Sequence, residues 1–226
     1  MEIIRLTKNY PCYSNLFVSF VTKLPNIKDI WIFNCHEACQ HSLIIQHIKI
    51  SQITKIIITD LHIENISGLL GLLSSLSLIK RVKELHIYGP IGLGHYIEFG
   101  KKYAQTNFCY DLYIHVLSTS RVLVNDMYNF YVFFDNLYFR GLLIFKAENG
   151  KFRLKKASDF NLVSGPMYGS LKRGNNFLLP DGFVMDGYNF SEYHIPGFKV
   201  AILMSKYHTR CSMELTYYAK FLYSVV

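Results

Sequence analysis

Four polar residues in one short segment have the types and spacing of metal ligands. Asp60, His62, Glu64 and Asn65 follow the apolar run at residues 56–58. Carboxylates and imidazoles bind divalent ions, and carboxylates in particular suit magnesium or manganese. Asp60, His62 and Glu64 can therefore hold one oxygen-preferring ion weakly. The alternative, which the sequence favours, is that they are solvated loop residues or hydrogen-bonding remnants.

The flanking patterns place this segment between a strand and a helix. Apolar and β-branched residues indicate a strand over residues 53–59, and the leucine-rich segment 68–78 indicates a helix. Further strands are expected over residues 3–6, 16–22, 30–34, 84–88 and 199–204. Further helices are expected over residues 36–48, 96–104 and 214–223. Alternating β-branched and aromatic residues predict antiparallel strands within 112–124 and 129–145. The segment 152–187 is more polar and rich in turns.

The composition indicates one folded domain spanning residues 1–226. Apolar residues make up 50% of the chain and charged residues 18%, which argues against disorder. No apolar run reaches the ~18 residues that a membrane span needs. The five cysteines follow an opening strand rather than a cleavable leader, which indicates reduced thiols in an internal compartment.

A second group of metal-binding residue types lies nearby. Cys35, His36 and Cys39 are close in sequence, with His41 beyond, and cysteines at i and i+4 share a helix face. Zinc is bound by such side chains. Free cysteines are also often simply buried, so a core role is the alternative.

Four blocks of sequence resemble the ribonuclease Z family of tRNA 3′-end endonucleases. Residues 31–40 (Trp-Ile-Phe-Asn-Cys-His-Glu-Ala-Cys-Gln) resemble its segment hydrophobic-Phe-Asp-Cys-Gly-Glu-Gly-Thr-Gln. Residues 68–75 (Gly-Leu-Leu-Gly-Leu-Leu-Ser-Ser) resemble its Gly-Leu-Pro-Gly-Leu-Leu-Ser-Ser. Residues 87–92 resemble its next strand end, and residues 165–174 resemble its Gly-Pro-Leu-Tyr-Gly-Lys-Leu-Lys-Arg-Gly segment. The blocks keep the family's order and similar spacing.

This resemblance implies an α/β fold, the metallo-β-lactamase-type αββα sandwich, here cut short at the C-terminus. It also implies a site for two zinc ions per chain in the loop His-x-His-x-Asp-His. In this chain Asp60 stands at the first histidine, His62 is retained, Glu64 stands at the aspartate that serves as general base, and Asn65 replaces the last histidine. The metal ligands implied are thus Asp60 and His62, and the catalytic base is Glu64.

The later ligand positions of the family also differ in this chain. Asn136 stands where the next histidine is expected, and Met204-Ser205-Lys206 replaces the Gly-Asp-Thr of the bridging aspartate. The chain ends about where the family's final histidine motif begins. The sequence therefore favours no bound metal, with two zinc ions expected if the site is functional.

The charge favours a nucleic-acid partner. Lys and Arg number 24 against 16 Asp and Glu, a net charge of +8, and neutralising phosphates releases counterions. The resemblance implies tRNA or precursor tRNA, and it implies that residues 150–190 form an arm-like insertion that grips tRNA. Lys172 and Arg173 are the predicted RNA contacts. The alternative is that Gly165-Pro166 and Gly169 simply fix a turn.

Three functions remain open. The chain is a zinc-dependent tRNA 3′-processing endonuclease with a rearranged or partner-completed site, a catalytically silent tRNA-binding protein or dimer partner, or a decaying reading frame. A homodimer or heteromer is expected, with the apolar helix 68–78 as its support, and no membrane partner.

The abundance of Ile, Tyr and Phe with a single Trp follows AT-rich codon usage, and small relatives of the family are encoded in algal plastids. The predicted location is therefore the plastid (chloroplast) stroma, or otherwise the cytoplasm.

Overall fold

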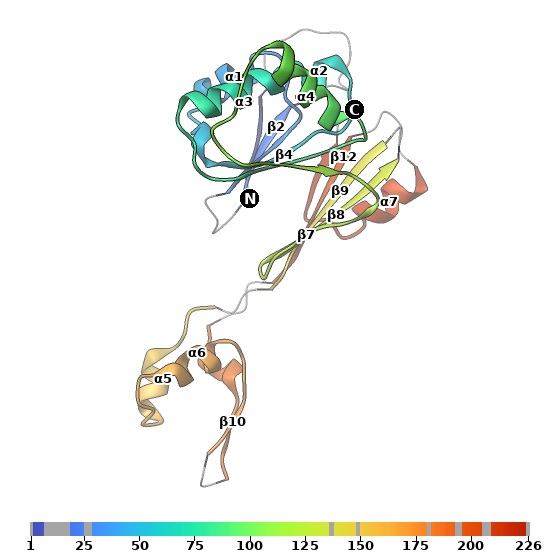
Figure 1. Cartoon of the computed structure of the whole chain (residues 1–226). Helices are drawn as coiled ribbons and strands as arrows, with labels where there is room; N and C mark the ends of the chain where they lie inside the picture. The colour runs from blue at the N-terminus through green and yellow to red at the C-terminus, as the bar shows by residue number, and fades with distance from the viewer. Residues whose placement is uncertain are drawn as a thin grey trace.

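Two β-sheets packed face to face, with helices on the outer side of the first, form the body of the protein in the computed structural model (Figure 1). The structure describes residues 2–6, 19–24, 29–135, 138–147, 150–179, 182–192, 196–204 and 209–224. A smaller segment projects from this body (Figure 1). No helix among the described residues is long and apolar enough to cross a membrane.

The first sheet has six strands in sequence order. They are β1 (Glu2–Arg5), β2 (Phe20–Lys23), β3 (Ile30–Phe33), β4 (Ile53–Ile57), β5 (Leu85–Gly89) and β6 (Leu112–Val116). The pairs β1–β2 and β2–β3 are antiparallel, and β3 to β6 run parallel. The predicted strands over 30–34, 53–59 and 84–88 are confirmed.

Both faces of this sheet are covered, which explains its continuous apolar strands. Ile56 packs with the helices, whereas the next residue, Ile57, packs against the second sheet. Trp31 also faces the second sheet, where its ring meets Tyr128 edge-on at a centroid distance of 5.4 Å. The strand sequence therefore needs apolar residues at successive positions rather than at alternate ones.

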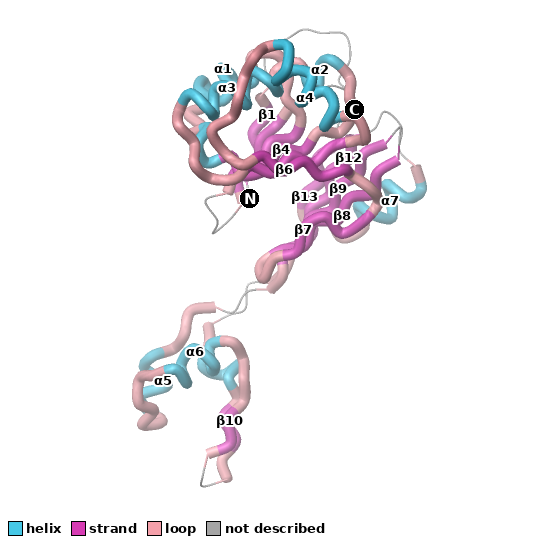
Figure 2. The backbone as a smooth tube through the Cα atoms, in the orientation of Figure 1, coloured by secondary structure: helices cyan, strands magenta, loops and turns pink. Residues whose placement is uncertain are grey.

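The outer layer contains α1 (Cys39–Ile45), α2 (Ile63–Ile66), α3 (Leu69–Leu78) and α4 (Leu93–Tyr103), with the short 3-10 helix η1 (Ile50–Gln52). Figure 2 shows these helices together on one side of the first sheet. Four leucines of α3 are buried in this layer: Leu69, Leu72, Leu73 and Leu76. Most of the apolar face of the predicted helix 68–78 therefore lies in the protein's own core. The predicted helix 36–48 is shorter, and α2 was not predicted.

The second sheet has the order β13 (Phe221–Ser224), β12 (Phe198–Met204), β9 (Tyr138–Phe145), β8 (Tyr128–Asp135) and β7 (Ser120–Val124). Its pairs are antiparallel except β12 with β13, which are parallel. The antiparallel strands expected within 112–145 are confirmed over β7, β8 and β9, whereas β6 pairs in parallel with β5. The helix α7 (Arg210–Thr216) connects β12 to β13.

The predicted helix over residues 214–223 is wrong in its second half. The helix ends at Thr216, and Tyr218 has a φ of 60°, which no continuing helix allows. The backbone amide of Lys220 donates to the carbonyl of Lys199, and Phe221 then pairs with Val200. The β-prone residues 221–223 join the sheet because a long-range partner strand is available.

The projecting segment has its own small core. It contains α5 (Leu154–Asp159), α6 (Pro166–Lys172), β10 (Phe177–Leu178), β11 (Val184–Met185) and the 3-10 helix η2 (Gly187–Phe190). Ala157, Leu171, Met185 and Phe190 are buried together. An antiparallel bridge between Phe152 and Ser191 joins the start and the end of the segment.

Candidate functional site

The loop that carries Asp60 and His62 lies where three parallel strands end. Strands β3, β4 and β5 point the same way, and the loops after them meet at one edge of the sheet. The amide of Asn34 donates to the carbonyl of Ile57, and the amide of Ile58 donates to the carbonyl of Tyr88. Such an edge is where ligands usually bind in open α/β sheets.

The Asp60 carboxylate is engaged in hydrogen bonds within its own loop. Its Oδ1 accepts from the backbone amide of His62 and from Nδ2 of Asn65, each at 2.8 Å. The first bond forms a tight side-chain turn, and the second crosses the loop. Two N–H groups of the protein therefore occupy Oδ1, one of the two carboxylate oxygens of Asp60.

His62 acts as the N-cap of α2. Its Nδ1 accepts from the backbone amide of Glu64 at 3.4 Å, which satisfies one of the free amides at the start of the helix. Nδ1 is therefore directed at the backbone. The ring as a whole is exposed, as is the Glu64 side chain in the first turn of the same helix.

Asn65 is buried at 1% exposure and fixes the loop to the turn after β3. Its carbonyl accepts from the amide of Cys35 at 2.8 Å, while its Nδ2 donates to Asp60. Its Oδ1 is buried with no hydrogen-bond partner among the described residues. An amide oxygen is a poor ligand for zinc, so this atom does not complete a zinc site.

The described residues do not fit a two-zinc centre. Among them, no three His, Cys, Asp or Glu side chains are grouped so as to hold a metal ion. Asp60 and His62 lie close together, but both direct ligand atoms at amide groups of the protein. Asn136, Ser205 and Lys206, at the later ligand positions, lie outside the described residues.

Asn34 and Thr59 also build this site, although the sequence did not indicate it. Oδ1 of Asn34 accepts from the backbone amide of Thr59 at 2.9 Å and from its hydroxyl at 3.0 Å. Asn34 is fully buried and has a φ of 57°, a region that asparagine tolerates better than most residues. The signals in the sequence were a polar residue at the end of the predicted strand 30–34 and the place of Asn34 within the block 31–40.

The second group, around Cys35 and Cys39, lies in the core. Both thiols are fully buried, and the hydrogen bond that the Cys35 thiol donates to Cys39, together with burial, raises the pKa of Cys35. Nε2 of His36 lies 3.1 Å from the hydroxyl of Ser42, and burial lowers the pKa of His36. His41 is exposed. The structure thus gives His36 a hydroxyl partner and leaves the two thiols to each other.

Lys172 and Arg173 lie in the projecting segment, at the end of α6, and both are exposed. Figure 1 shows α6 well separated from α2 and the loop before it. The structure therefore brings Asp60, His62 and Glu64 into one loop but keeps the two predicted RNA contacts apart from them.

No protein-family model matches the chain. An uncharacterized protein named ycf56 from Pyropia yezoensis is 35% identical over 206 residues, which are 90% of this chain and 78% of the relative. Ribonuclease Z of Microcystis aeruginosa is 35% identical over 222 residues, which are 95% of this chain and 69% of the relative.

The solved structure of human tRNase Z, short form, matches with a TM-score of 0.53 at 24% identity. The match covers 63% of this chain and 64% of the human chain. This likeness supports the fold, and the predicted metallo-β-lactamase-type architecture is confirmed. The identity and coverage shared with Microcystis ribonuclease Z place the chain in the ribonuclease Z family.

Proposed function

We propose that this chain serves tRNA 3′-end maturation as a tRNA-binding protein that does not hydrolyse RNA by itself. The observation that carries the proposal is the pair of 2.8 Å hydrogen bonds on Oδ1 of Asp60. These bonds close the loop with protein groups in place of an ion. The family supplies the substrate class, because its named members are ribonuclease Z enzymes.

The chemistry of the family explains why this loop matters. Hydrolysis with two metal ions needs about three protein ligands per zinc and a metal separation of roughly 3.5–4 Å. To take up an ion through Oδ1 of Asp60, the loop would have to give up two hydrogen bonds to that carboxylate, each contributing roughly 1.5–3 kcal/mol. It would also lose the cap that His62 places on α2 if Nδ1 were the ligand. Autonomous catalysis is therefore disfavoured.

The projecting segment supports RNA binding as an arm. Helix α6 begins at Pro166 and ends at Lys172, and the φ of 84° at Gly174, just beyond it, reverses the chain. The amide of Gly174 donates to the carbonyl of Leu171, which holds this end in place. Lys172 and Arg173 are thus exposed at a hydrogen-bonded turn, where they can neutralise phosphates.

We further propose that the protein resides in the plastid and that it associates with a second copy or with another subunit. The plastid location rests on the relative named ycf56 in Pyropia yezoensis and on the composition. Association is supported by the exposed apolar residues at and beyond the end of α3. Leu78 and Val82, for example, are 83% and 88% exposed. Organelle fractionation and light scattering of the purified chain test these two points.

Binding and cleavage measured side by side test the main proposal. Fluorescence anisotropy with a precursor tRNA should show binding that persists in EDTA and weakens with salt. The double substitution Lys172→Gln and Arg173→Gln should reduce that binding, whereas Lys49→Gln, at an exposed lysine elsewhere, should not. Cleavage of the 3′ trailer that disappears in EDTA and in His62→Ala would overturn the proposal and establish an enzyme.

A further inference from the structure

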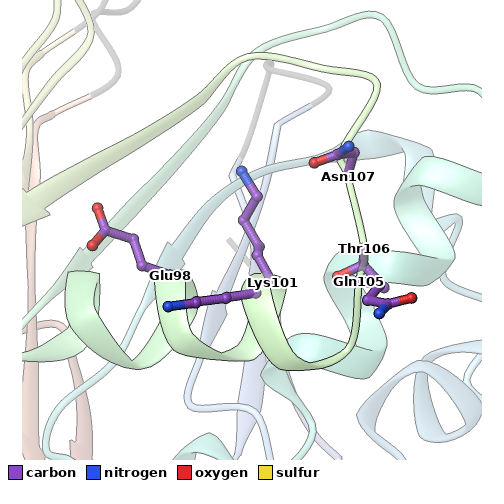
Figure 3. A pocket seen from close by; sticks show the side chains of 6 residues that line it. Glu98, Lys101, Gln105, Thr106 and Asn107 are labelled. Carbon is purple, nitrogen blue, oxygen red and sulfur yellow. The ribbon is translucent and has the colours of Figure 1, made fainter.

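A polar groove lies at the C-terminal end of α4, in the helical layer. It is lined by Glu98, Lys101, Lys102, Gln105, Thr106 and Asn107. Figure 3 shows Lys101 extending from the helix toward the segment after it, which contributes Asn107. Helix α4 begins near the candidate loop, since a Cβ on Gly92 would lie 3.2 Å from the Leu61 side chain. The 11 residues of α4 span ~16 Å, and the groove lies along the second half of the helix, away from that loop.

The groups in this groove suit the parts of a nucleotide. The two lysines can pair with phosphates, and the amides of Gln105 and Asn107 can both donate to and accept from base edges. Lys101 is partly buried, and its Nζ lies 5.5 Å from the centroid of the Phe108 ring. This contact orients the lysine before any ligand arrives.

Two exposed aromatic rings lie on the helix that carries the groove. Phe99 and Tyr103 are 56% and 77% exposed, with ring centroids 6.3 Å apart and planes inclined by 22°. They are four residues apart and therefore neighbours on the helix surface. Lys102 lies between them in sequence and is also exposed. Aromatic faces beside lysines are the surface on which unpaired bases stack.

One side chain in the groove, Glu98, carries a negative charge that disfavours an anionic ligand. Glu98 lines the groove, its side chain is 77% exposed, and its partner is His95 at 4.0 Å. At this exposure and distance the ion pair is weak. A phosphate in the groove would therefore be repelled by Glu98. A substitution that removes this charge should strengthen binding, whereas substitutions of the lysines should weaken it.

We propose that the groove and the Phe99–Tyr103 pair bind single-stranded RNA. A single strand is required because the bases of a duplex are already stacked on each other and have no free faces. Lys101 and Lys102 neutralise the backbone, while Tyr103 stacks with a base. This inference rests on the proposed function, to which it adds a second RNA contact distinct from Lys172 and Arg173.

The test uses the full chain and a labelled uridine 12-mer, with an RNA duplex of the same length for comparison. Tyr103→Ala should weaken 12-mer binding by about 5- to 100-fold, whereas Tyr103→Phe, which keeps the ring, should change it by less than about twofold. Lys101→Gln with Lys102→Gln should lower the slope of log affinity against log salt by roughly 1.4. Glu98→Gln should tighten binding. Duplex binding should respond little to the Tyr103 substitutions.

Matched controls separate this inference from the proposed function. Tyr217→Ala removes a tyrosine that is 66% exposed at the end of α7, and Lys49→Gln removes an exposed lysine; neither should affect the 12-mer. Circular dichroism confirms folding of each variant. Equal losses of 12-mer affinity in Tyr103→Ala and Tyr103→Phe, or no loss in either, would overturn the inference that the groove binds RNA. If only the Lys172 and Arg173 substitutions weaken the 12-mer, the arm is its site and the groove inference fails while the proposed function stands.

Discussion

The amide nitrogen of Asn65 lies 2.8 Å from the Asp60 carboxylate, across the loop that holds metal in the ribonuclease Z family. Asn65 is buried, and its own backbone carbonyl is tied to Cys35 after the neighbouring strand. The loop is therefore shaped by protein hydrogen bonds on both sides.

Replacing Asp60 should show this directly. Asp60→Ala leaves the buried Nδ2 of Asn65 without its acceptor, whereas the exposed amide of His62 can bond to water instead. We therefore expect the free energy of unfolding to fall by about 1.5–3 kcal/mol. Asp60→Asn keeps an oxygen at the same place and should cost less. Urea unfolding measures both. Equal destabilisation by the two substitutions would show that the loop needs the negative charge, as a metal ligand would, rather than an acceptor.

Chelation should have little effect on the same loop. Because Asp60 and His62 already bond to amides of the protein, we expect the melting temperature to be the same with and without EDTA. Zinc added after dialysis should not raise it beyond what nonspecific binding gives. Calorimetry measures the melting temperature, and plasma mass spectrometry measures the zinc content of the dialysed protein. A stoichiometry near two zinc ions per chain would contradict this expectation.

The sequence predicted the strands over 30–34, 53–59 and 84–88 and the helix over 68–78 well because local patterns decide them. Residues 56–58 are buried on successive faces, and such a run is visible without any partner. The role of Asn34 was not predictable, since its partner Thr59 lies 25 residues away. The strand at Phe221 also depends on a distant partner, Val200. The groove after α4 depends on the backbone at Gln105, whose φ of 50° no pattern in the sequence announces.

We expect the protein to lose stability in mild acid because two histidines, His36 and His115, become protonated. Burial lowers the pKa of His36, and burial together with the neighbouring His86 lowers that of His115. Nε2 of His115 lies 3.0 Å from Nδ1 of His86, and the Glu84 carboxylate lies 3.4 Å from the other nitrogen of His86. In the unfolded chain both histidines protonate near pH 6.5, before the folded chain does. Stability should therefore be level above that pH and fall as the pH drops through the lower pKa values of the folded state.

Urea unfolding at pH 7.5, 6.5 and 5.5 measures this dependence. His115→Gln should reduce the slope of stability against pH, because one of the two groups no longer titrates. His41→Gln, at an exposed histidine, serves as the control and should leave the slope unchanged. Higher stability at pH 5.5 than at pH 7.5 would refute the assignment.

Substitutions at two glycines of the projecting segment should distinguish the effect of its internal packing on tRNA binding from the effect of its surface residues. A Cβ on Gly187 would lie 2.5 Å from the carbonyl oxygen of Asn175 and 2.8 Å from that of Leu171, both backbone atoms. Gly187→Ala should therefore push η2 away from α6 and disturb the turn that carries Lys172 and Arg173. Gly169 lies in α6 with no atom within 4 Å of such a Cβ, so Gly169→Ala should stabilise the helix by up to about 1 kcal/mol.

Limited proteolysis and tRNA binding distinguish these two variants. We expect Gly187→Ala to be cleaved faster within residues 150–192 and to bind tRNA more weakly, because its lysine and arginine are no longer held in place. Gly169→Ala should resist cleavage at least as well as the parent chain and keep its affinity. Unchanged tRNA affinity in a Gly187→Ala protein whose projecting segment is demonstrably loosened would mean that a fixed arm is not needed for binding. The RNA contacts would then have to be sought on the body of the protein.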